Sequence, residues 1–497
     1  MAKRIFCLVL ALLMLLSLFS CKKKDEEGDS TTVATTVGGE AVVDIDPHLE
    51  AIDGDGKVIR VLTREMGLDS NYWYGEVNYV GADMTSPVDS NVVARDKLIE
   101  EKYNVKIKSE QINYNKIATT IDTQIRGMAT DEESYHIVLP MLVHAFNMTN
   151  NGYNYSIDSL KFIDPEKPYW RSDIYDSTTV KGKNYFISGD INTSVYGSSY
   201  VCFFNEELIE SNGIDDPYEI VKQGEWTIEK MLQLGENFGG DGGDGIYDAT
   251  DNYTVCSGEW VWYCFMYGSG LKFVEKDTDD VPRLVTGNAG AREKIQDILV
   301  RTVNIMNDPS VAINIHQYKD IKQASKLFCD NQVLFYFSAI NNTFIPNDIK
   351  DMEQEYGVLP LPKRDDNQEE YYNTVHPYHS STTIVPANIS EGMLPLISSI
   401  LEDLSYQSYL LVKPAYYDNI ITHRSIRNES SYEMIPYIFA NFNIDFGLIM
   451  TDIFGFDAEV RNKIHTNDIN FSSYLSGYTS LWNKALADIV DTYGGEQ

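Results

Sequence analysis

The sequence predicts an α/β protein with two lobes, and three observations support this. Short runs rich in β-branched residues alternate with amphipathic segments of helical spacing over residues 57–142. This alternation is typical of a largely parallel sheet with right-handed crossovers. About 440 residues follow the N-terminal region, more than one hydrophobic core usually supports. Apolar residues make up 43% of the chain, which is enough to fill two cores.

The first lobe is expected to alternate strands and helices. In order, we expect a strand at 57–65, a helix at 90–103, a strand at 104–110, a helix at 117–128 and a strand at 136–142. Ser90 is expected to be the N-cap of the first helix. In the second helix, Ile117, Ile121, Ile125 and Met128 recur every three or four residues, so they share one apolar face.

The rest of the body is expected to repeat this pattern. Thr227 is placed as the N-cap of a helix over 227–239. The other expected elements are strands at 181–190 and 200–205, a short helix that Gly213 ends, helices near 288–306 and 317–328, strands at 333–339 and 356–362, a crossing segment at 382–388 and a last helix over 474–490.

The N-terminus is typical of a bacterial lipoprotein signal. Lys3 and Arg4 precede an apolar run over 5–19, which is shorter than a membrane-spanning helix usually is. Ser20 then precedes Cys21, as a small residue precedes the lipidated cysteine of a lipobox. We therefore expect residues up to Ser20 to be removed and Cys21 to be lipidated. A plain signal peptide, with an incidental cysteine at this position, is the alternative.

A disordered tether is expected at 21–56. After the cysteine, this stretch has no aromatic residue and is rich in Asp, Glu, Thr, Gly and Ser. A flexible chain of about 35 residues has a root-mean-square reach of roughly 30 Å. The sequence thus predicts a monomeric body held at the outer face of the cell membrane by a lipid anchor.

Charge and cysteine content limit the partners and the cross-links. The formal net charge is -34, which argues against nucleic acid as a partner because the phosphate backbone would be repelled. The body contains Cys202, Cys256, Cys264 and Cys329, with no spacing that resembles a zinc site. Export permits disulfides, and buried thiols are the alternative.

Seven segments occur in an order that resembles the extracellular solute-binding proteins of family 1, the sugar-binding lipoproteins of ATP-driven importers. They are GKNYFISGD, CFFNEELIESNGI, EWTIEKMLQLGENF, GGDGGDGIYDATDNY, YGVLPLPKRDDNQEEYY, TTIVPAN and PAYYDNII. The LPLPK and AYY stretches are similar to a clostridial-type subgroup. The resemblance covers about residues 57–490.

This resemblance implies a type II periplasmic-binding-protein-like fold: two lobes, each a mainly parallel sheet flanked by helices, joined by a hinge. The first part of the N-terminal lobe would occupy 57–185. Residues 186–375 would form mainly the C-terminal lobe with crossing strands, and 376–497 the return crossing and the C-terminal helices. A carbohydrate would bind between the lobes, and the closed form would engage an ABC permease.

Candidate ligand contacts lie first at the carboxyl ends of the predicted parallel strands, where loops collect ligands. A sugar needs aromatic faces together with hydrogen-bonding side chains. Tyr72 and Trp73 follow the first strand, at a place where matching family members have ligand contacts. Glu65 and His144, at strand ends, are weaker candidates.

The remaining candidates lie near the crossing segments and in the second lobe. Asp190 and Tyr196 precede a crossing strand, and Tyr378 lies near the return crossing. Trp260 and Trp262 occur where related binders have an aromatic residue. In an extended segment both indoles would point to the same side. The alternative is that both fill the second core.

The stretch GGDGGDGIYDATD resembles a calcium loop of the EF-hand type. With Gly245 as the central glycine, Asp244, Asp248 and Asp251 occupy loop positions 5, 9 and 12. Positions 1 and 3 are glycines, and Asp241 would have to substitute from an altered geometry. A structural calcium site is therefore one interpretation, and a plain Gly-Asp turn is the other. No other cofactor is predicted.

A solute-binding role fits these observations better than catalysis. No nucleophile elbow, phosphate-binding loop or metalloprotease helix occurs in the sequence. The expected function is capture of a carbohydrate for import, with an oligosaccharide as the favoured kind. The alternatives are the same role with a peptide or a modified sugar, a surface glycan-active enzyme, and a sensor that feeds a signalling partner.

Overall fold

The structure is a computed structural model. It describes residues 44–65, 75–77, 87–313, 324–344, 349–418 and 428–494. The chain from Asp46 onward forms one compact unit. Residues 46–56 therefore belong to the folded body and not to the tether expected at 21–56, because the backbone N–H groups of Gly54 and Gly56 donate to the carbonyls of Tyr103 and Asn104. Within the described ranges, no helix combines the length and apolarity needed to cross a bilayer.

The first sheet has three parallel strands in the order β2-β1-β3. They are β1 (Val58–Arg64), β2 (Lys106–Ile112) and β3 (Ile137–Val138). In this register Val61 of β1 lies opposite Ser109 of β2 and Ile137 of β3. The predicted parallel sheet of the first lobe is confirmed, and we use "first lobe" for this sheet and its helices.

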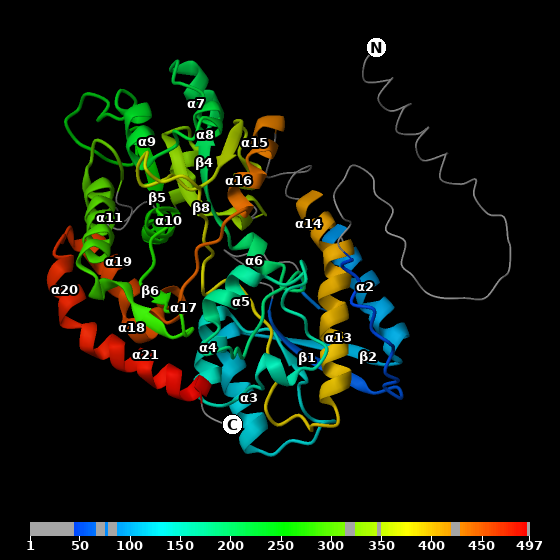
Figure 1. Cartoon of the computed structure of the whole chain (residues 1–497). Helices are drawn as coiled ribbons and strands as arrows, with labels where there is room; N and C mark the ends of the chain where they lie inside the picture. Colours follow the sequence, from blue (N-terminus) through cyan, green and yellow to red (C-terminus); the bar gives the residue numbers. More distant parts are fainter. Residues whose placement is uncertain are drawn as a thin grey trace, which may run out of the picture. The chain divides into compact units, whose positions relative to one another are not determined.

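Helices cover both faces of the first sheet (Figure 1). They include α2 (Pro87–Tyr103), α3 (Ile117–Arg126), α4 (Leu142–Asn150) and α13 (Leu394–Gln407). Ile59 and Val61 belong to the same buried cluster as Ile397 of α13. Leu62, which points the opposite way in the strand, belongs to a cluster with Ile121 of α3. The alternation of side chains along β1 therefore places one helical layer on each face.

The second sheet has four strands in the order β5-β8-β4-β9. They are β4 (Tyr200–Asn205), β5 (Tyr253–Ser257), β8 (Val333–Ala339) and β9 (Tyr356–Leu359). Only the pair of β5 and β8 is parallel, whereas β4 is antiparallel to both β8 and β9. The expectation of a mainly parallel sheet thus holds for the first lobe and not for this one. We use "second lobe" for this sheet and its helices.

Three chain segments run between the two sheets. The segment 375–385 pairs with the first lobe through Ile384 and Val138, and with the second through Val375 and Ser199. The segment 186–200 runs antiparallel to it, with Ile187 paired to Thr383. The third segment follows α16 (Ile435–Phe439), and in it Asn443 donates its backbone N–H to the Asn373 carbonyl at 2.7 Å. The expected strand at 181–190 is therefore a crossing segment held by isolated bridges, while the strand predicted at 200–205 is β4.

The remaining helices and strands complete the two lobes. Up to residue 287 these are η2 (Tyr114–Lys116), η3 (Ile157–Ser159), α5 (Ser172–Thr178), α6 (Ser194–Gly197), α7 (Glu206–Ser211), α8 (Pro217–Lys222), α9 (Ile228–Gly235), α10 (Val261–Gly268), β6 (Val274–Lys276), β7 (Pro282–Leu284) and η4 (Val285–Gly287). After it come α11 (Ala289–Asn307), α12 (Ala324–Cys329), η5 (Ile340–Phe344), η6 (Ile349–Asp351), α15 (Glu429–Glu433), α16 (Ile435–Phe439), α17 (Phe446–Ile449), α18 (Thr451–Phe454), α19 (Phe456–Thr466), α20 (Phe471–Gly477) and α21 (Thr479–Gly494).

Several helix boundaries differ from the sequence predictions. Thr227 caps α9 as predicted, because its hydroxyl accepts the Lys230 N–H at 3.1 Å. Ser90 is not an N-cap, since α2 already begins at Pro87. The predicted last helix is two helices, α20 and α21, that meet at Tyr478. Of the helix expected near 317–328, the described part is α12.

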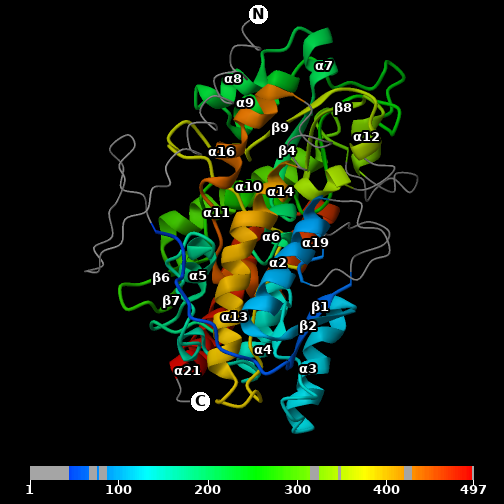
Figure 2. The same ribbon diagram turned by 90° about the vertical axis from the view of Figure 1, so that its right-hand side faces the viewer.

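A π-helical turn interrupts the long helical run of α13. The turn η7 (Ser408–Val412) follows this helix, and α14 (Lys413–Asp418) continues directly from it. Arg95 of α2 donates to the Ser408 hydroxyl at 2.8 Å, and both side chains are buried. Figure 2 shows α2 and α13 side by side, with α14 beyond the end of α13. Single π turns occur mostly inside α-helices and often at functional sites.

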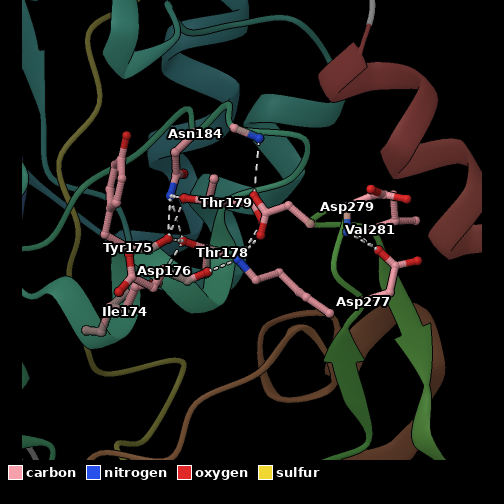
Figure 3. A network of polar contacts seen from close by, with 12 residues as sticks. Ile174, Tyr175, Asp176, Thr178, Thr179, Asn184, Asp277, Asp279 and Val281 are labelled. Carbon is pink, nitrogen blue, oxygen red and sulfur yellow. Dashed lines mark hydrogen bonds and ion pairs between the residues drawn. The ribbon is translucent and has the colours of Figure 1, made fainter.

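The β6–β7 hairpin is fastened to the first lobe by a polar network. Figure 3 shows Asp176 and Thr179 facing the turn that carries Asp277. The Lys276 ammonium donates to the carbonyls of Asp176 and Thr179. It also pairs with Asp280 at 2.5 Å. These contacts of Lys276 connect the hairpin, which follows α10, to the end of α5 and the turn after it.

Candidate functional site

A buried carboxylate lies where the crossing segments meet α14. Asp190 is 1% exposed and accepts a hydrogen bond from the Tyr196 hydroxyl. The Lys413 ammonium lies 3.3 Å from the second carboxylate oxygen. Tyr196 is on α6 and Lys413 begins α14, so the carboxylate joins two segments that are far apart in the sequence. Both Asp190 and Tyr196 were sequence candidates, and the structure brings them into direct contact.

Aromatic rings surround Tyr196. Its ring centroid lies 5.7 Å from that of Tyr416, 5.5 Å from Tyr417 and 6.2 Å from Phe439. Lys413 lies 5.8 Å from the same ring. We call Asp190, Tyr196, Lys413 and these three rings the junction cluster. It combines aromatic rings with charged side chains that can form hydrogen bonds, the two kinds of group that a sugar contacts.

The electrostatics of the junction cluster follow from its burial. Desolvation raises the pKa of Asp190, while the charges of Lys413 and Arg171 and the Tyr196 hydrogen bond oppose this rise. The Arg171 guanidinium lies 4.2 Å from the centroid of Phe442, a cation–π geometry. Lys413 keeps 26% of its side chain exposed, so its ammonium can also donate to a solute.

A second group of rings lies at the start of β4, an inner strand of the second sheet. Tyr200 and Tyr263 stack with their centroids 6.0 Å apart. His376 lies about as far from each of them. Burial lowers the pKa of His376 to about 3, so its imidazole is neutral at physiological pH. Tyr378, a sequence candidate, packs its ring edge-on against His376 at 5.9 Å and is partly exposed.

The two tryptophan candidates have different environments. The segment is helical from Val261, so the extended arrangement that would turn Trp260 and Trp262 to the same side does not occur. Trp262 is 1% exposed, stacks on Tyr263 at 4.0 Å and donates its indole N–H to Asp457 at 3.1 Å. This placement agrees with the core-filling alternative. Trp260 is partly exposed, and its indole N–H donates to the Phe337 carbonyl at 3.0 Å.

Two charged residues of the first lobe were missed by sequence reasoning. Arg64, the last residue of β1, donates to the His379 carbonyl at 2.8 Å. Burial lowers its pKa to about 10, so it stays charged at neutral pH. Glu76 is 4% exposed and accepts hydrogen bonds from the hydroxyls of Ser194 and Ser381 at 2.7 and 2.6 Å. The strand-end rule could have found Arg64, whereas no local pattern marks Glu76.

Glu65 and His144, the two strand-end candidates, are not part of the junction cluster. Glu65 is exposed and accepts a hydrogen bond from Asn113 at 3.0 Å. The His144 ring stacks on Tyr114, with centroids 5.8 Å apart. Both pairs lie at the carboxyl edge of the first sheet, as the strand order requires.

Three sequence candidates lie outside the described residues. Tyr72 and Trp73 belong to the range 66–74, and Cys21 lies in the range 1–43. Their roles as ligand contacts and as the lipidation site therefore stay predictions.

The carboxylates of the proposed calcium loop serve the turns in which they lie. Asp241 and Asp244 each accept the backbone N–H two residues further on, at 3.0 and 2.8 Å. Asp248 accepts from Thr250, and Asp251 accepts the Asp248 N–H at 2.7 Å. Nowhere in the described ranges do three or more His, Cys, Asp or Glu side chains gather as metal ligands would.

The described cysteines form no disulfide. Cys202, Cys256 and Cys264 are buried thiols, and Cys329 is partly exposed. Burial raises the pKa of Cys256 to about 12, so this thiol stays protonated. Of the two states that the sequence left open, disulfides and thiols, the structure contains the thiols.

Comparisons with known proteins identify the fold. No protein-family model matches the sequence, and no curated protein matches it either. Among solved structures, the chain is similar to an ABC substrate-binding protein from Listeria monocytogenes in complex with cycloalternan. The TM-score is 0.53 at 13% identity, over 87% of this chain and 100% of the other.

Two further structures give the same result. A cyclo/maltodextrin-binding protein complexed with maltotetraose has a TM-score of 0.54 at 11% identity, over 89% of this chain and 98% of its own. The maltotriose-binding protein of Thermus thermophilus has a TM-score of 0.51 at 11% identity, over 86% of this chain and all of its own. The chain has the type II periplasmic-binding-protein fold, with two α/β lobes joined by crossing segments.

Proposed function

We propose that the protein is an extracellular solute-binding protein that captures an oligosaccharide between its lobes and delivers it to an ABC import permease. The observation that carries this proposal is the shared fold, over 87% and 89% of the chain, with binding proteins solved around cycloalternan and maltotetraose. The junction cluster supports it, because aromatic faces lie beside an ion pair at the crossing segments.

The chemistry of a sugar explains this choice of ligand. A pyranose has apolar C–H faces that pack on aromatic rings, and hydroxyls that both donate and accept hydrogen bonds. Lys413 of the junction cluster and Tyr378, which packs against His376, are both partly exposed. A solute that contacts both lobes favours the closed state by its difference in affinity between the two states.

The cellular location that we propose is the outer face of the cell membrane, with Cys21 lipidated and the stretch between Cys21 and the compact unit that begins at Asp46 as the tether. Replacing Cys21 with serine should move the protein from the membrane fraction to the soluble fraction, because the acyl anchor is lost. Immunoblotting of fractionated cells measures this. If the variant stays in the membrane fraction to the same extent as the wild type, Cys21 is not the anchor.

A panel of oligosaccharides tests the solute-binding role. Sugars that bind should raise the free energy of unfolding by roughly 2.7 kcal/mol at 100 times their dissociation constant. Differential scanning fluorimetry with maltotetraose, cycloalternan, mannotriose, cellotriose and xylotriose measures this shift. A reducing-end assay on the same samples should show that every sugar remains intact.

The other outcomes lead to different functions. New reducing ends would indicate a glycan-active enzyme and would contradict the proposal. A shift with short peptides and with none of the sugars would keep the transport role and replace the ligand class.

A further inference from the structure

The first lobe contains a cavity of about 940 Å³ that lies away from the junction cluster. It forms where residues 152–161 meet residues 387–395 and the turn at 183–185. Ligand sites for small molecules usually have volumes of roughly 300–1,000 Å³. The cavity is therefore large enough for a small organic ligand.

The cavity and the junction cluster lie at opposite ends of one helical run. Leu394, the first residue of α13, lines the cavity. Lys413, which pairs with Asp190, begins α14 beyond the π turn. At 1.5 Å per residue, these two positions are roughly 28 Å apart along the helix axis. Figures 1 and 2 both show α13 running away from α14. One sugar ring cannot occupy both places.

A buried amide at the cavity has an acceptor without a donor. Asn154 is 1% exposed, and its amide NH₂ donates to the Tyr185 carbonyl and to the Thr149 hydroxyl. These two bonds fix the orientation of the amide, because a flipped oxygen would face the Tyr185 carbonyl. The Asn154 oxygen is buried and receives no hydrogen bond. A buried acceptor left unsatisfied costs about 1–3 kcal/mol, so a ligand hydroxyl that reached this oxygen would recover part of that cost.

The other lining residues provide both donors and acceptors. Lys161 and Lys183 can donate, Glu391 can accept, and the Ser159 hydroxyl can do both. A carboxylate or phosphate ligand would use the donors and be repelled by Glu391. Hydroxyl groups use donors and acceptors alike, so the lining fits a polyhydroxylated ligand better than an anion.

Apolar surface completes the lining. Tyr155 is partly exposed, and its hydroxyl donates to the Ile389 carbonyl at 2.8 Å, which holds the ring in place. Leu394 and Pro395 lie on the α13 side of the cavity. A fixed aromatic ring with aliphatic neighbours is a suitable surface for the C–H face of a sugar.

We propose that this cavity is a second saccharide-binding site, confined to the first lobe. The choice of a saccharide rests on the proposed function, whereas the existence of a polyol site rests on the cavity itself. All lining segments pack within one lobe, so a ligand bound here has no differential affinity for the open and closed states. The site can therefore hold a sugar whether the lobes are open or closed.

A substitution that fills the cavity tests the proposal. Ser159 is exposed and lies on η3 at the cavity, so a Ser159→Trp side chain can enter it without disturbing a core. Binding of the sugar panel is measured by saturation-transfer NMR and isothermal titration calorimetry. For at least one panel sugar, the affinity for Ser159→Trp should be at least tenfold lower than the affinity for the wild type. The affinity of the same sugar for the junction variant Asp190→Asn should equal that for the wild type.

Two control variants accompany the test. Ser159→Ala leaves the cavity open and should bind within about threefold of the wild type, a difference of about 0.7 kcal/mol. Ser211→Trp places the same indole on an exposed serine of α7 and should bind like the wild type.

The outcomes separate this inference from the proposed function. If every sugar that binds the wild type also binds Ser159→Trp equally well and is lost in Asp190→Asn, only the junction site exists and the inference fails. If no panel sugar binds the wild type, both proposals fail. If binding is lost in Ser159→Trp alone, the first-lobe site stands and the interlobe site fails.

Discussion

Replacing Trp482 with alanine should lower the free energy of unfolding by about 3–5 kcal/mol, since a large buried side chain is lost and a cavity remains. Trp482 is 1% exposed, and its indole N–H donates to the Phe454 carbonyl at 3.0 Å. Its ring lies 5.4 Å from Phe456, 5.5 Å from Tyr474 and 5.9 Å from Tyr478. The indole thus joins α21 to α18, α19 and α20.

The measurement is differential scanning calorimetry of the variant beside a matched control. Leu481→Ala alters the neighbouring residue of the same helix, whose side chain is 54% exposed, and should change stability by less than about 0.5 kcal/mol. Equal melting temperatures for the two variants would show that the C-terminal helices do not contribute to the cooperative core.

Replacing Asp190 with asparagine should weaken binding of the junction sugar at least tenfold, a loss of about 1.4 kcal/mol. The amide oxygen can still accept the Tyr196 hydroxyl, so the fold should persist. The substitution removes the negative charge that pairs with Lys413, whose ammonium lies 3.3 Å from the carboxylate in the wild type. Because Asp190 is 1% exposed, it acts by positioning Tyr196 and Lys413.

Titration calorimetry with an effective panel sugar measures this loss. The control is Asp488→Asn, which removes the partner of Lys484 in an exposed ion pair on α21. That pair is solvent-screened and lies outside the junction cluster, so sugar affinity should not change. Wild-type affinity in Asp190→Asn would exclude the junction cluster from solute binding.

Much of the strand content could be predicted from local sequence. The runs VIRVLTR and VLFYFSA are short, rich in β-branched or aromatic residues, and correspond to β1 and β8. The order of strands in the second sheet could not be predicted, because a fully buried strand has the same composition in parallel and antiparallel pairing. The segment Val261–Gly268 was not recognised as a helix, since all eight residues are buried and no apolar face stands out.

The candidate site could be predicted only in part. Asp190 and Tyr196 are six residues apart, so one sequence window contained both. The partner that neutralises Asp190 is Lys413, separated by 223 residues, and no local pattern links them. Glu76 likewise depends on Ser194 and Ser381, which only the fold brings together. Such contacts arise from the crossing of segments and have no periodicity to detect.

The π turn η7 determines which way the end of the long helical run faces. Each residue of an α-helix advances the direction of its side chain by about 100°, so one additional residue in a turn rotates everything after it by that angle. Leu401 and Leu404 of α13 are buried in the first lobe, while Lys413 and Tyr416 of α14 face the junction. A single inserted residue is thus sufficient to redirect the end of a helix that faces the junction cluster, while its other end stays packed in a core. A change in the length of this turn would therefore bring different side chains of α14 to the junction cluster, with neither sheet altered.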